Sequence, residues 1–283
     1  MFQDCSWRGF ALPAGRILRP ASSAILVCAA LSAGVSAQLP VPAPQPKTAV
    51  EVDKPAVLGT LPSARSVVDR HLAAIGGRAA VLAHSSTAAK GTLSMPKPGI
   101  TGKLEIYGAK PNKSLLKISL GGVGEVSEGF DGTHGWSHSP VTGPMLLDGK
   151  QLEERKFDSE FYGELRDESR YSSMTTLEQT EFDQRPCHKV RLVRKSGGED
   201  IEFYDVATGL KAGSITTRET HMGKVTVTTV ETDYRKFGNL LQPTTIKSQT
   251  AGMEQVITIA AVEYDNVPAS VFEMPAEIKA LIK

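Results

Sequence analysis

From Thr87 onward, polar and apolar residues alternate along most of the chain. Leu104 and Ile106, for example, alternate with charged or aromatic neighbours, which is typical of a strand with one buried and one solvated face. Short β-branched runs bounded by Gly, Pro, Asn and Asp repeat this pattern and predict further strands. The predicted strands are AAKGTLSM, TGKLEIYGA, NKSLLKISL, GEVSEGFDG and THGWSHS, followed by Thr176–Asp183, His188–Lys195, Asp200–Asp205, Leu210–His221, Lys224–Phe237, Leu240–Thr250 and Met253–Tyr264.

Apolar residues recur at helical spacing in two other places. After Ser63, a suitable N-cap, a helix is predicted that ends at Gly76-Gly77, and a short second helix is predicted over Arg78–Leu82. The segment Lys150–Tyr171 places apolar residues four or five apart among charged ones, which predicts an amphipathic helix.

Ten or more antiparallel strands joined by short turns, with two helical insertions, predict an α+β chain. A sheet of that size tends to curl around whatever covers its apolar face. We therefore expect one large curved antiparallel sheet wrapped over a few helices.

The first 62 residues differ in composition from the rest. Residues 1–37 predict a secretory signal peptide, because three arginines precede an uncharged run that ends in Val35-Ser36-Ala37. An uncleaved N-terminal anchor is the alternative. Residues 38–62 contain six prolines and predict an extended linker, so that residues 63–283 would form the folded domain.

Charge and cysteine content narrow the possible functions. The formal net charge of the whole chain is +1, and it becomes −1 without residues 1–37, so the chain has no field that would gather nucleic acid. Of the three cysteines, Cys187 alone would remain after cleavage. A single cysteine cannot form an internal disulfide, so we expect the core alone to stabilise the fold.

Few residues suggest catalysis or metal binding. Asp131, His134 and His138 could hold a metal ion, but two histidines four apart on a strand stand about 13 Å apart. Cys187 and His188 are neighbours on a predicted strand and would point to opposite faces. The sequence therefore predicts no catalytic residue, no metal and no cofactor, and a buried structural Cys187.

The predicted helix over Lys150–Tyr171 and Trp136 are the remaining candidates for a ligand site. Charged side chains of the predicted helix are expected to form its solvated face, while Phe157, Phe161 and Leu165 form either a lid over a cavity or ordinary core packing. Trp136 could line a ligand pocket or close the rim of the sheet. The charged residues in question are Glu153, Glu154, Arg155, Lys156, Asp158 and Glu160.

Several segments between Ser63 and Pro275 resemble the outer membrane lipoprotein-sorting protein family, the LolA-like periplasmic carriers, and in particular its larger secreted bacterial members. This resemblance implies an unclosed half-barrel with an apolar cavity for acyl chains between the sheet and the helices. The segments are Ala74-Ile75-Gly76-Gly77, Gly102–Tyr107 before Ala109-Lys110-Pro111-Asn112, Glu128-Gly129-Phe130-Asp131-Gly132 leading to Gly135-Trp136, Phe203–Leu210, Asp233-Tyr234 to Leu241-Gln242-Pro243, and Phe272-Glu273-Met274-Pro275.

These observations favour a secreted, periplasmic, noncatalytic protein that binds a lipid, an acyl chain of a lipoprotein or another apolar ligand, as a carrier or a sensor. A structural domain that docks envelope proteins is the alternative, and a secreted hydrolase or metal-dependent enzyme is a third class. No nucleic acid and no membrane span after signal cleavage are expected. The residues expected to line the apolar cavity are Trp136, Phe157, Phe161, Leu165, Leu104 and Ile106.

Overall fold

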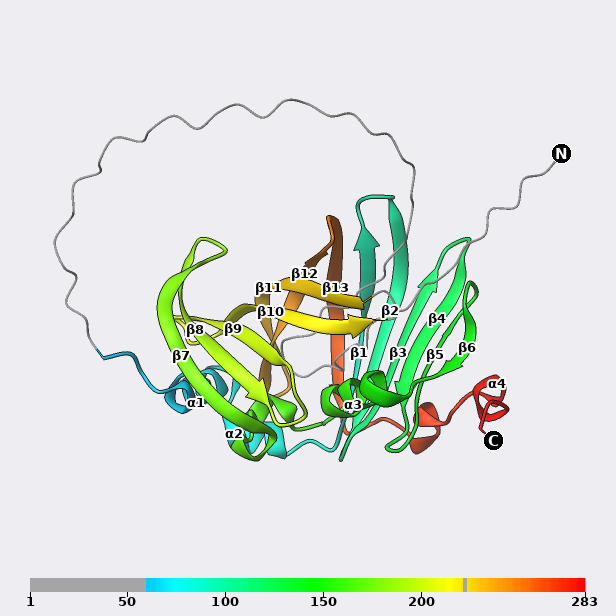
Figure 1. Cartoon of the computed structure of the whole chain (residues 1–283), viewed down its shortest axis with the longest axis horizontal. Coiled ribbons are helices and arrows are strands. Elements are labelled where there is room, and N and C mark those ends of the chain that lie inside the picture. The colour runs from blue at the N-terminus through cyan, green and yellow to red at the C-terminus, as the bar shows by residue number, and fades with distance from the viewer. Residues whose placement is uncertain (1–59, 221–222, 283) are drawn as a thin grey trace, which may run out of the picture.

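A computed structural model describes residues 60–220 and 223–282, so the predicted signal peptide and most of the proline-rich segment lie outside the described residues. One sheet of 13 antiparallel strands organises this part of the chain (Figure 1). Its strand order is β6-β5-β4-β3-β2-β1-β13-β12-β11-β10-β9-β8-β7, and its two ends do not pair with each other. The α+β half-barrel predicted from the sequence is confirmed.

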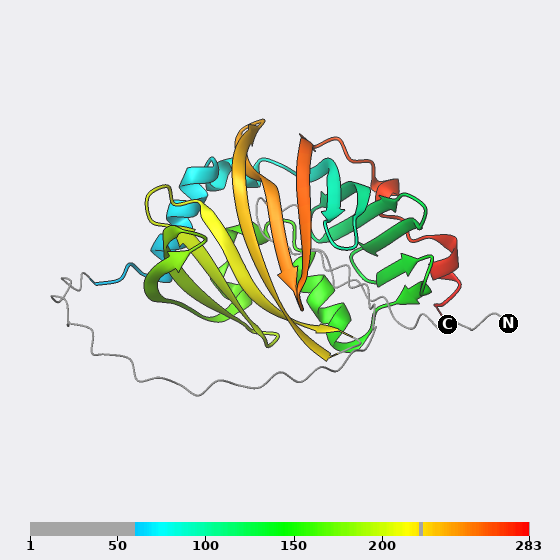
Figure 2. The ribbon, with the colours of Figure 1, turned by 90° about the horizontal axis from the view of Figure 1, so that it is seen from above.

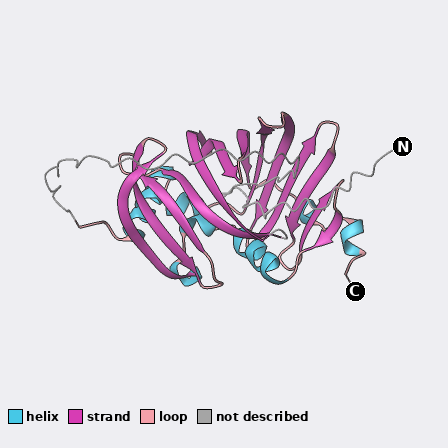
Figure 3. Cartoon of the chain, turned by 45° about the horizontal axis from the view of Figure 1, so that its top comes forward, coloured by secondary structure: helices cyan, strands magenta, loops and turns pink. Residues whose placement is uncertain are grey.

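The strands make up most of the described chain (Figure 3). All predicted strands are present, and the short end strand β6 is an additional one. The strands are β1 (Ser86–Met95), β2 (Ile100–Ala109), β3 (Lys113–Leu120), β4 (Gly124–Phe130), β5 (Gly135–Ser139), β6 (Gly143–Leu146), β7 (Tyr171–Phe182), β8 (Arg185–Arg194), β9 (Glu199–Asp205), β10 (Lys211–Thr220), β11 (Gly223–Phe237), β12 (Leu240–Thr250) and β13 (Met253–Tyr264). The helices are α1 (Ala64–Ile75), α2 (Arg78–Leu82), α3 (Gly149–Asp158) and α4 (Ala276–Lys279), with 3-10 turns η1 (Gly163–Leu165), η2 (Glu168–Arg170) and η3 (Ala269–Phe272).

Helix α1 begins and ends as its sequence predicts. The hydroxyl of Ser63 accepts a hydrogen bond from the backbone N–H of Ser66 at 3.1 Å, which caps the first turn. Gly76 ends the helix with a φ of 129°, and a Cβ there would lie 2.5 Å from the carbonyl oxygen of Asn239. Only glycine fits at this point, so the end of α1 is fixed against the β11–β12 turn.

The predicted helix over Lys150–Tyr171 is too long. Helix α3 ends at Asp158, two 3-10 turns follow, and Tyr171 already begins β7. Arg166, between the two turns, adopts a left-handed conformation with a φ of 47° that a helix cannot contain. The apolar spacing of this segment therefore reflects an irregular chain that touches the core at several points.

Strand register defines two faces of the sheet. Residues paired across antiparallel strands point to the same side, and Ile106, Leu116 and Glu128 form one such row. Glu128 is bonded to Arg155 of α3, so this row lies on the face that carries α3, which we call the inner face. The neighbouring row lies on the outer face and contains Tyr107, Leu115, Gly129 and Trp136.

Two glycines sit where the strands bend. The register shifts beside Gly91 in β1 and again between Lys211 and Gly213 in β10. A Cβ on either glycine would lie 2.0 Å from a carbonyl oxygen of the adjacent strand. Such bulges increase the local bend and twist of a sheet, and Figure 2 shows the strands turning progressively from β7 at one end to β6 at the other.

A buried ion-pair cluster joins α1 and η1 to the inner face of β9–β11. Arg166 donates to both carboxylate oxygens of Glu202, at 3.0 and 2.6 Å, and Lys211 lies 2.9 Å from Glu231. Each of these side chains is shielded from solvent almost completely. The cluster consists of His71, Glu164, Arg166, Glu202, Lys211 and Glu231.

His71 joins α1 to this cluster. Its Nε2 lies 2.8 Å from the Glu164 carboxylate and its Nδ1 lies 3.3 Å from the Gly209 carbonyl oxygen. Both ring nitrogens therefore face an oxygen acceptor in the buried interface. Burial raises the pKa of Glu164, but the charges of Arg166 and His71 and the hydrogen bond from His71 outweigh burial and lower it.

We predict that Arg166→Met destabilises the protein strongly. The change leaves the Glu202 carboxylate buried without its bidentate partner, and removing one member of a buried pair costs about 3–5 kcal/mol of unfolding free energy. Urea denaturation measures this loss. Arg191→Met is the matched control, because the Arg191–Glu199 pair is about half exposed and should cost less than about 1 kcal/mol. Equal losses in the two variants would contradict the prediction.

Candidate functional site

An apolar cluster covers the part of the inner face between the Glu231–Lys211 pair and the Glu128–Arg155 pair. Its members come from β1, β2, β3, β4, β12 and β13, and within the described part of the chain none of them belongs to a helix. We call it the inner apolar cluster. Its members are Ala89, Leu93, Met95, Leu104, Ile106, Leu116, Ile118, Leu120, Val126, Ile246, Ile257 and Ile259.

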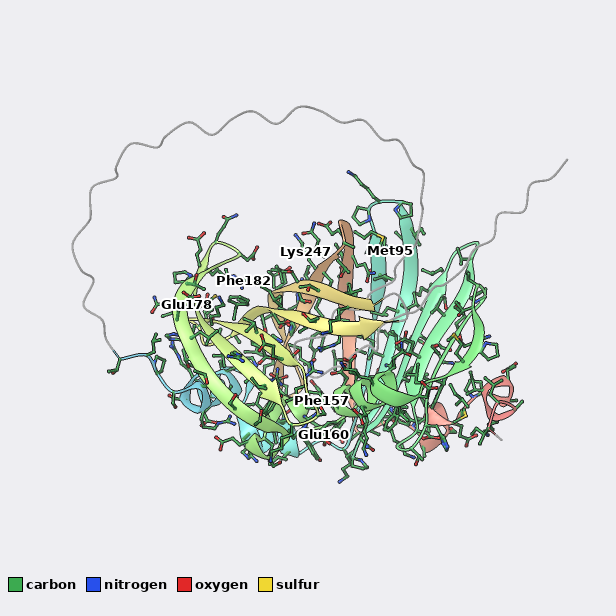
Figure 4. The ribbon with its side chains drawn as sticks, in the orientation of Figure 1. Met95, Phe157, Glu160, Glu178, Phe182 and Lys247 are labelled. Carbon is green, nitrogen blue, oxygen red and sulfur yellow. The ribbon has the colours of Figure 1, made fainter. Side chains whose placement is uncertain are left out.

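The described helices lie along one margin of the sheet. In Figure 1 they all sit at the lower edge, whereas the β1–β2 and β12–β13 hairpins rise well above them. Figure 4 places Met95 near the upper end of β1 and Phe157, in the last turn of α3, at the lower margin. The upper part of the inner apolar cluster therefore has no described helix over it.

Helix α3 crosses the inner face and is held at both of its sides by buried charges. It contacts β5 and β10. Arg155 is bonded to Glu128 of β4, and Asp158 lies 3.9 Å from Arg218 of β10. Arg155 and Asp158 are each only 1% exposed, so the prediction that they belong to a solvated helix face is wrong. Opposite charges on the sheet, which are distant in sequence, account for their burial.

Two of the three residues expected to form a lid, Phe157 and Leu165, pack in the core beneath α1 and α2. The guanidinium groups of Arg170 and Arg194 also lie against the ring of Phe157, 4.0 and 4.6 Å from its centre. Phe161 follows α3, and its backbone N–H donates to the carbonyl oxygen of Pro111 at 2.9 Å. The structure does not bring these three residues together with the inner apolar cluster.

Trp136 points to the outer face. It is fully buried beneath the C-terminal segment, and its ring covers Gly129, where a Cβ would lie only 2.2 Å from the indole. Of the six residues expected to line the cavity, only Leu104 and Ile106 belong to the inner apolar cluster. The side chains buried with Trp136 are Leu115, Phe272, Met274 and Ile278.

A clamp that the sequence did not suggest joins the beginning of β1 to the end of β13. Asp265 accepts hydrogen bonds from the backbone N–H of Ser85 at 2.6 Å, from the Ser85 hydroxyl at 2.9 Å and from His84 Nδ1 at 2.7 Å. Burial alone would raise the pKa of Asp265, but these hydrogen bonds lower it from 3.8 to about 2. The serine bonds directly to the carboxylate and not to the imidazole, so the three residues do not form a nucleophilic triad.

The lowered pKa of Asp265 predicts an acid dependence of stability. Because the pKa is depressed in the folded state, the carboxylate stabilises the fold above pH 4, and this contribution disappears as the pH falls toward 2. Unfolding free energies of the wild type and Asp265→Asn should differ at pH 5 and converge between pH 4 and 2. A difference that persists unchanged at pH 2 would contradict the assignment.

Asp131 and His134, which were considered for metal binding, belong to a hydrogen-bonded turn. Asp131 Oδ1 accepts from the backbone N–H groups of Thr133 and His134, at 2.8 and 2.7 Å, as in an Asx turn. Across residues 60–220 and 223–282, no group of three His, Cys, Asp or Glu side chains is arranged to hold a metal ion. Asp131, His134 and His138 are therefore close in sequence but do not form a metal site.

Cys187 and His188 point to opposite faces, as their positions on a strand predict. Cys187 is fully buried on the outer face with Phe203 and Ala212. His188 lines a small cavity of about 190 Å³ beside α1, together with Arg70. Burial lowers the pKa of His188, and Arg70 lowers it further. The two side chains cannot act as a nucleophile and its base.

Cys187 should be unreactive in the folded protein. Burial raises the pKa of its thiol to about 11, so very little thiolate forms at pH 8. A chromogenic disulfide reagent should label less than about a tenth of the thiol in native protein, and all of it in denaturant. Rapid labelling under native conditions would show that the site opens.

No helix in the part of the chain that the structure describes is long and apolar enough to cross a membrane.

Comparison with known proteins identifies the fold. No protein-family model matches the sequence, and no curated protein matches it either. Among solved structures, a DUF1329 family protein from Desulfovibrio piger has a TM-score of 0.51 at 12% identity, covering 74% of this chain and 97% of its own. A LolA superfamily protein from Nitrosomonas europaea has a TM-score of 0.50 at 13% identity, covering 76% of this chain and 99% of its own. The chain therefore has a LolA-like fold.

Proposed function

We propose that the protein is a noncatalytic carrier or sensor of an apolar ligand such as a lipid or an acyl chain. The observation that carries this proposal is the inner apolar cluster, which twelve strand residues form on a concave face without a described helix over its upper part. Leu104 and Ile106 lie in its centre. A curved apolar face of this kind suits a flexible hydrocarbon chain, because shape and apolarity matter more than directed polar contacts.

The energetics are compatible with this ligand. Each buried methylene contributes about 0.8 kcal/mol, so about 16 methylenes on the cluster supply about 13 kcal/mol. After an association cost of about 4–5 kcal/mol, about 8 kcal/mol remains, which corresponds to micromolar binding. The inner apolar cluster contains no charged side chain, so the ligand chain would meet none there. The ion pairs that share the inner face are already compensated by one another.

We further propose that the protein works outside the cytoplasm, in the periplasm. The arginine-flanked uncharged run that ends in Val35-Ser36-Ala37 supports export. Cys187, the one cysteine of the described residues, is free, so the described fold needs a strong noncovalent core in that compartment, and the sheet with its buried ion pairs supplies one. Lipids or lipoprotein acyl chains and other envelope proteins are the partners that this location offers.

The direct test is native mass spectrometry of gently purified protein, followed by titration with a fluorescent fatty acid. We expect copurified lipid, or saturable uptake of the probe at a stoichiometry near one. Protein that carries no lipid and takes up no probe would contradict the proposal.

Leu104→Trp should block uptake if the inner apolar cluster is the ligand site. The indole would occupy space that the ligand otherwise fills, so probe affinity should fall about tenfold or more while the fold persists. Glu105→Trp is the matched control, because it places the same side chain on the outer face of the same strand. Loss of uptake in both variants, or in neither, would contradict the assignment.

A docking domain is the second candidate, and one observation favours it. Strand β7 is twelve residues long and lies at the end of the sheet, where an extended partner segment could pair with it. In that case the inner face would be filled by the protein itself. Leu104→Trp would then lower the unfolding free energy by about 1–3 kcal/mol through overpacking, and the wild type would bind no lipid.

A further inference from the structure

The inner face changes from apolar to polar near the upper end of β12. Ser248 and Thr250 follow Ile246 at two-residue steps, so all three side chains point to the inner face. Ser248 is 4% exposed and Thr250 is 2% exposed. Lys247 and Gln249, which alternate with them along the strand, are exposed on the outer face.

The two inner hydroxyls are buried without hydrogen-bond partners. Neither Ser248 Oγ nor Thr250 Oγ1 has a partner among the described residues. A buried hydroxyl that bonds to nothing is unfavourable, and such groups in native proteins are normally satisfied by a water or a ligand. We call Ser248 and Thr250 the hydroxyl pair.

The hydroxyl pair adjoins the apolar cluster directly. One step down the sheet, Ile246 pairs with Ile257, and Ile257 pairs with Leu93, and all three belong to the inner apolar cluster. Two residue steps along a strand span about 6.6 Å, so one small polar head group can reach both hydroxyls. A ligand with a hydrocarbon chain on the cluster would therefore place its polar end beside Ser248 and Thr250.

The direct cross-strand partners of the hydroxyl pair are uncharged. Ser248 pairs with Thr229 on one side and with Gln255 on the other, and Thr250 pairs with Val227. The basic side chains that β10 places on this face, Lys211 and Arg218, are already held by carboxylates, Lys211 by Glu231 at 2.9 Å and Arg218 by Asp200 at 3.1 Å. A charged head group would find no free countercharge there, whereas hydroxyl and ester groups would find partners.

We propose that Ser248 and Thr250 form the polar end of the ligand site, and that the site prefers an amphiphile with an uncharged, hydrogen-bonding head, such as an acylglycerol. This inference rests on the proposed function. It specifies the ligand class that the inner apolar cluster alone leaves open.

Displacement of the neutral dye N-phenyl-1-naphthylamine tests the inference with the purified protein. Monopalmitoylglycerol and palmitate carry the same hydrocarbon chain and differ in the charge of the head. We expect the wild type to bind monopalmitoylglycerol at least about tenfold more tightly than palmitate, because the ionised carboxylate must be desolvated without a countercharge.

The double variant Ser248→Ala and Thr250→Val removes both hydroxyls and keeps the shape of the site. It should lose about tenfold in affinity for monopalmitoylglycerol and change less than twofold for palmitate and for the dye. Its thermal midpoint should not fall, because the hydroxyls have no partners to lose in the free protein. The matched control is Thr245→Val with Gln249→Ala, on the outer face of the same strand.

The outcomes separate this inference from the proposed function. If the dye and palmitate bind but the double variant binds monopalmitoylglycerol as well as the wild type does, the hydroxyls hold only water and the inference is overturned. Preference for palmitate in the wild type overturns it as well. If none of the three compounds binds to the wild type, the proposed function fails and the inference fails with it.

Discussion

Burial of charge between helices and sheet is the constraint on which the rest of the structure depends. Glu202 and Glu231 stand on the inner face of β9 and β11, and each is paired there with a buried cation, Glu202 with Arg166 and Glu231 with Lys211. These pairs admit few alternative positions for η1 and α1, because a shift of either element would leave a carboxylate unpaired. Hydrophobic contacts alone would tolerate more sliding.

This constraint divides the inner face into two regions of different chemistry. On the β8–β11 side, helices cover a layer of compensated charges, and the side chains are committed to one another. Over β1–β4, β12 and β13 the inner apolar cluster comes from strands alone within the described chain, with the Glu128–Arg155 pair at its edge. Helix α3 spans both regions, since Arg155 is bonded to Glu128 of β4 and Asp158 lies near Arg218 of β10. The part of the sheet that anchors its helices is thus distinct from the apolar part, where we propose that a ligand binds.

The sequence predicts the sheet well because the alternation of Leu104 and Ile106 with polar neighbours is a local signal. It does not predict the buried charges, because Arg155 on a highly charged helix looks solvated unless Glu128, 27 residues away, is known to face it. Trp136 could not be assigned to a face either, since that depends on its register with Gly129 and on the C-terminal segment that covers it. Of the candidate site, the sequence could indicate the apolar strands, whereas the roles of Phe157 and Leu165 depend on tertiary contacts.

The bend of β1 and β10 is set by backbone packing at Gly91 and Gly213, because a Cβ at either glycine would lie 2.0 Å from a carbonyl oxygen of the adjacent strand. The curvature of the inner face is therefore fixed by the main chain and not by what lies against it. A surface whose shape is set in advance loses little conformational entropy on binding, which would favour the ligand site proposed above. By the same reasoning, any other residue at either glycine would change the curvature of the sheet and not only the local packing.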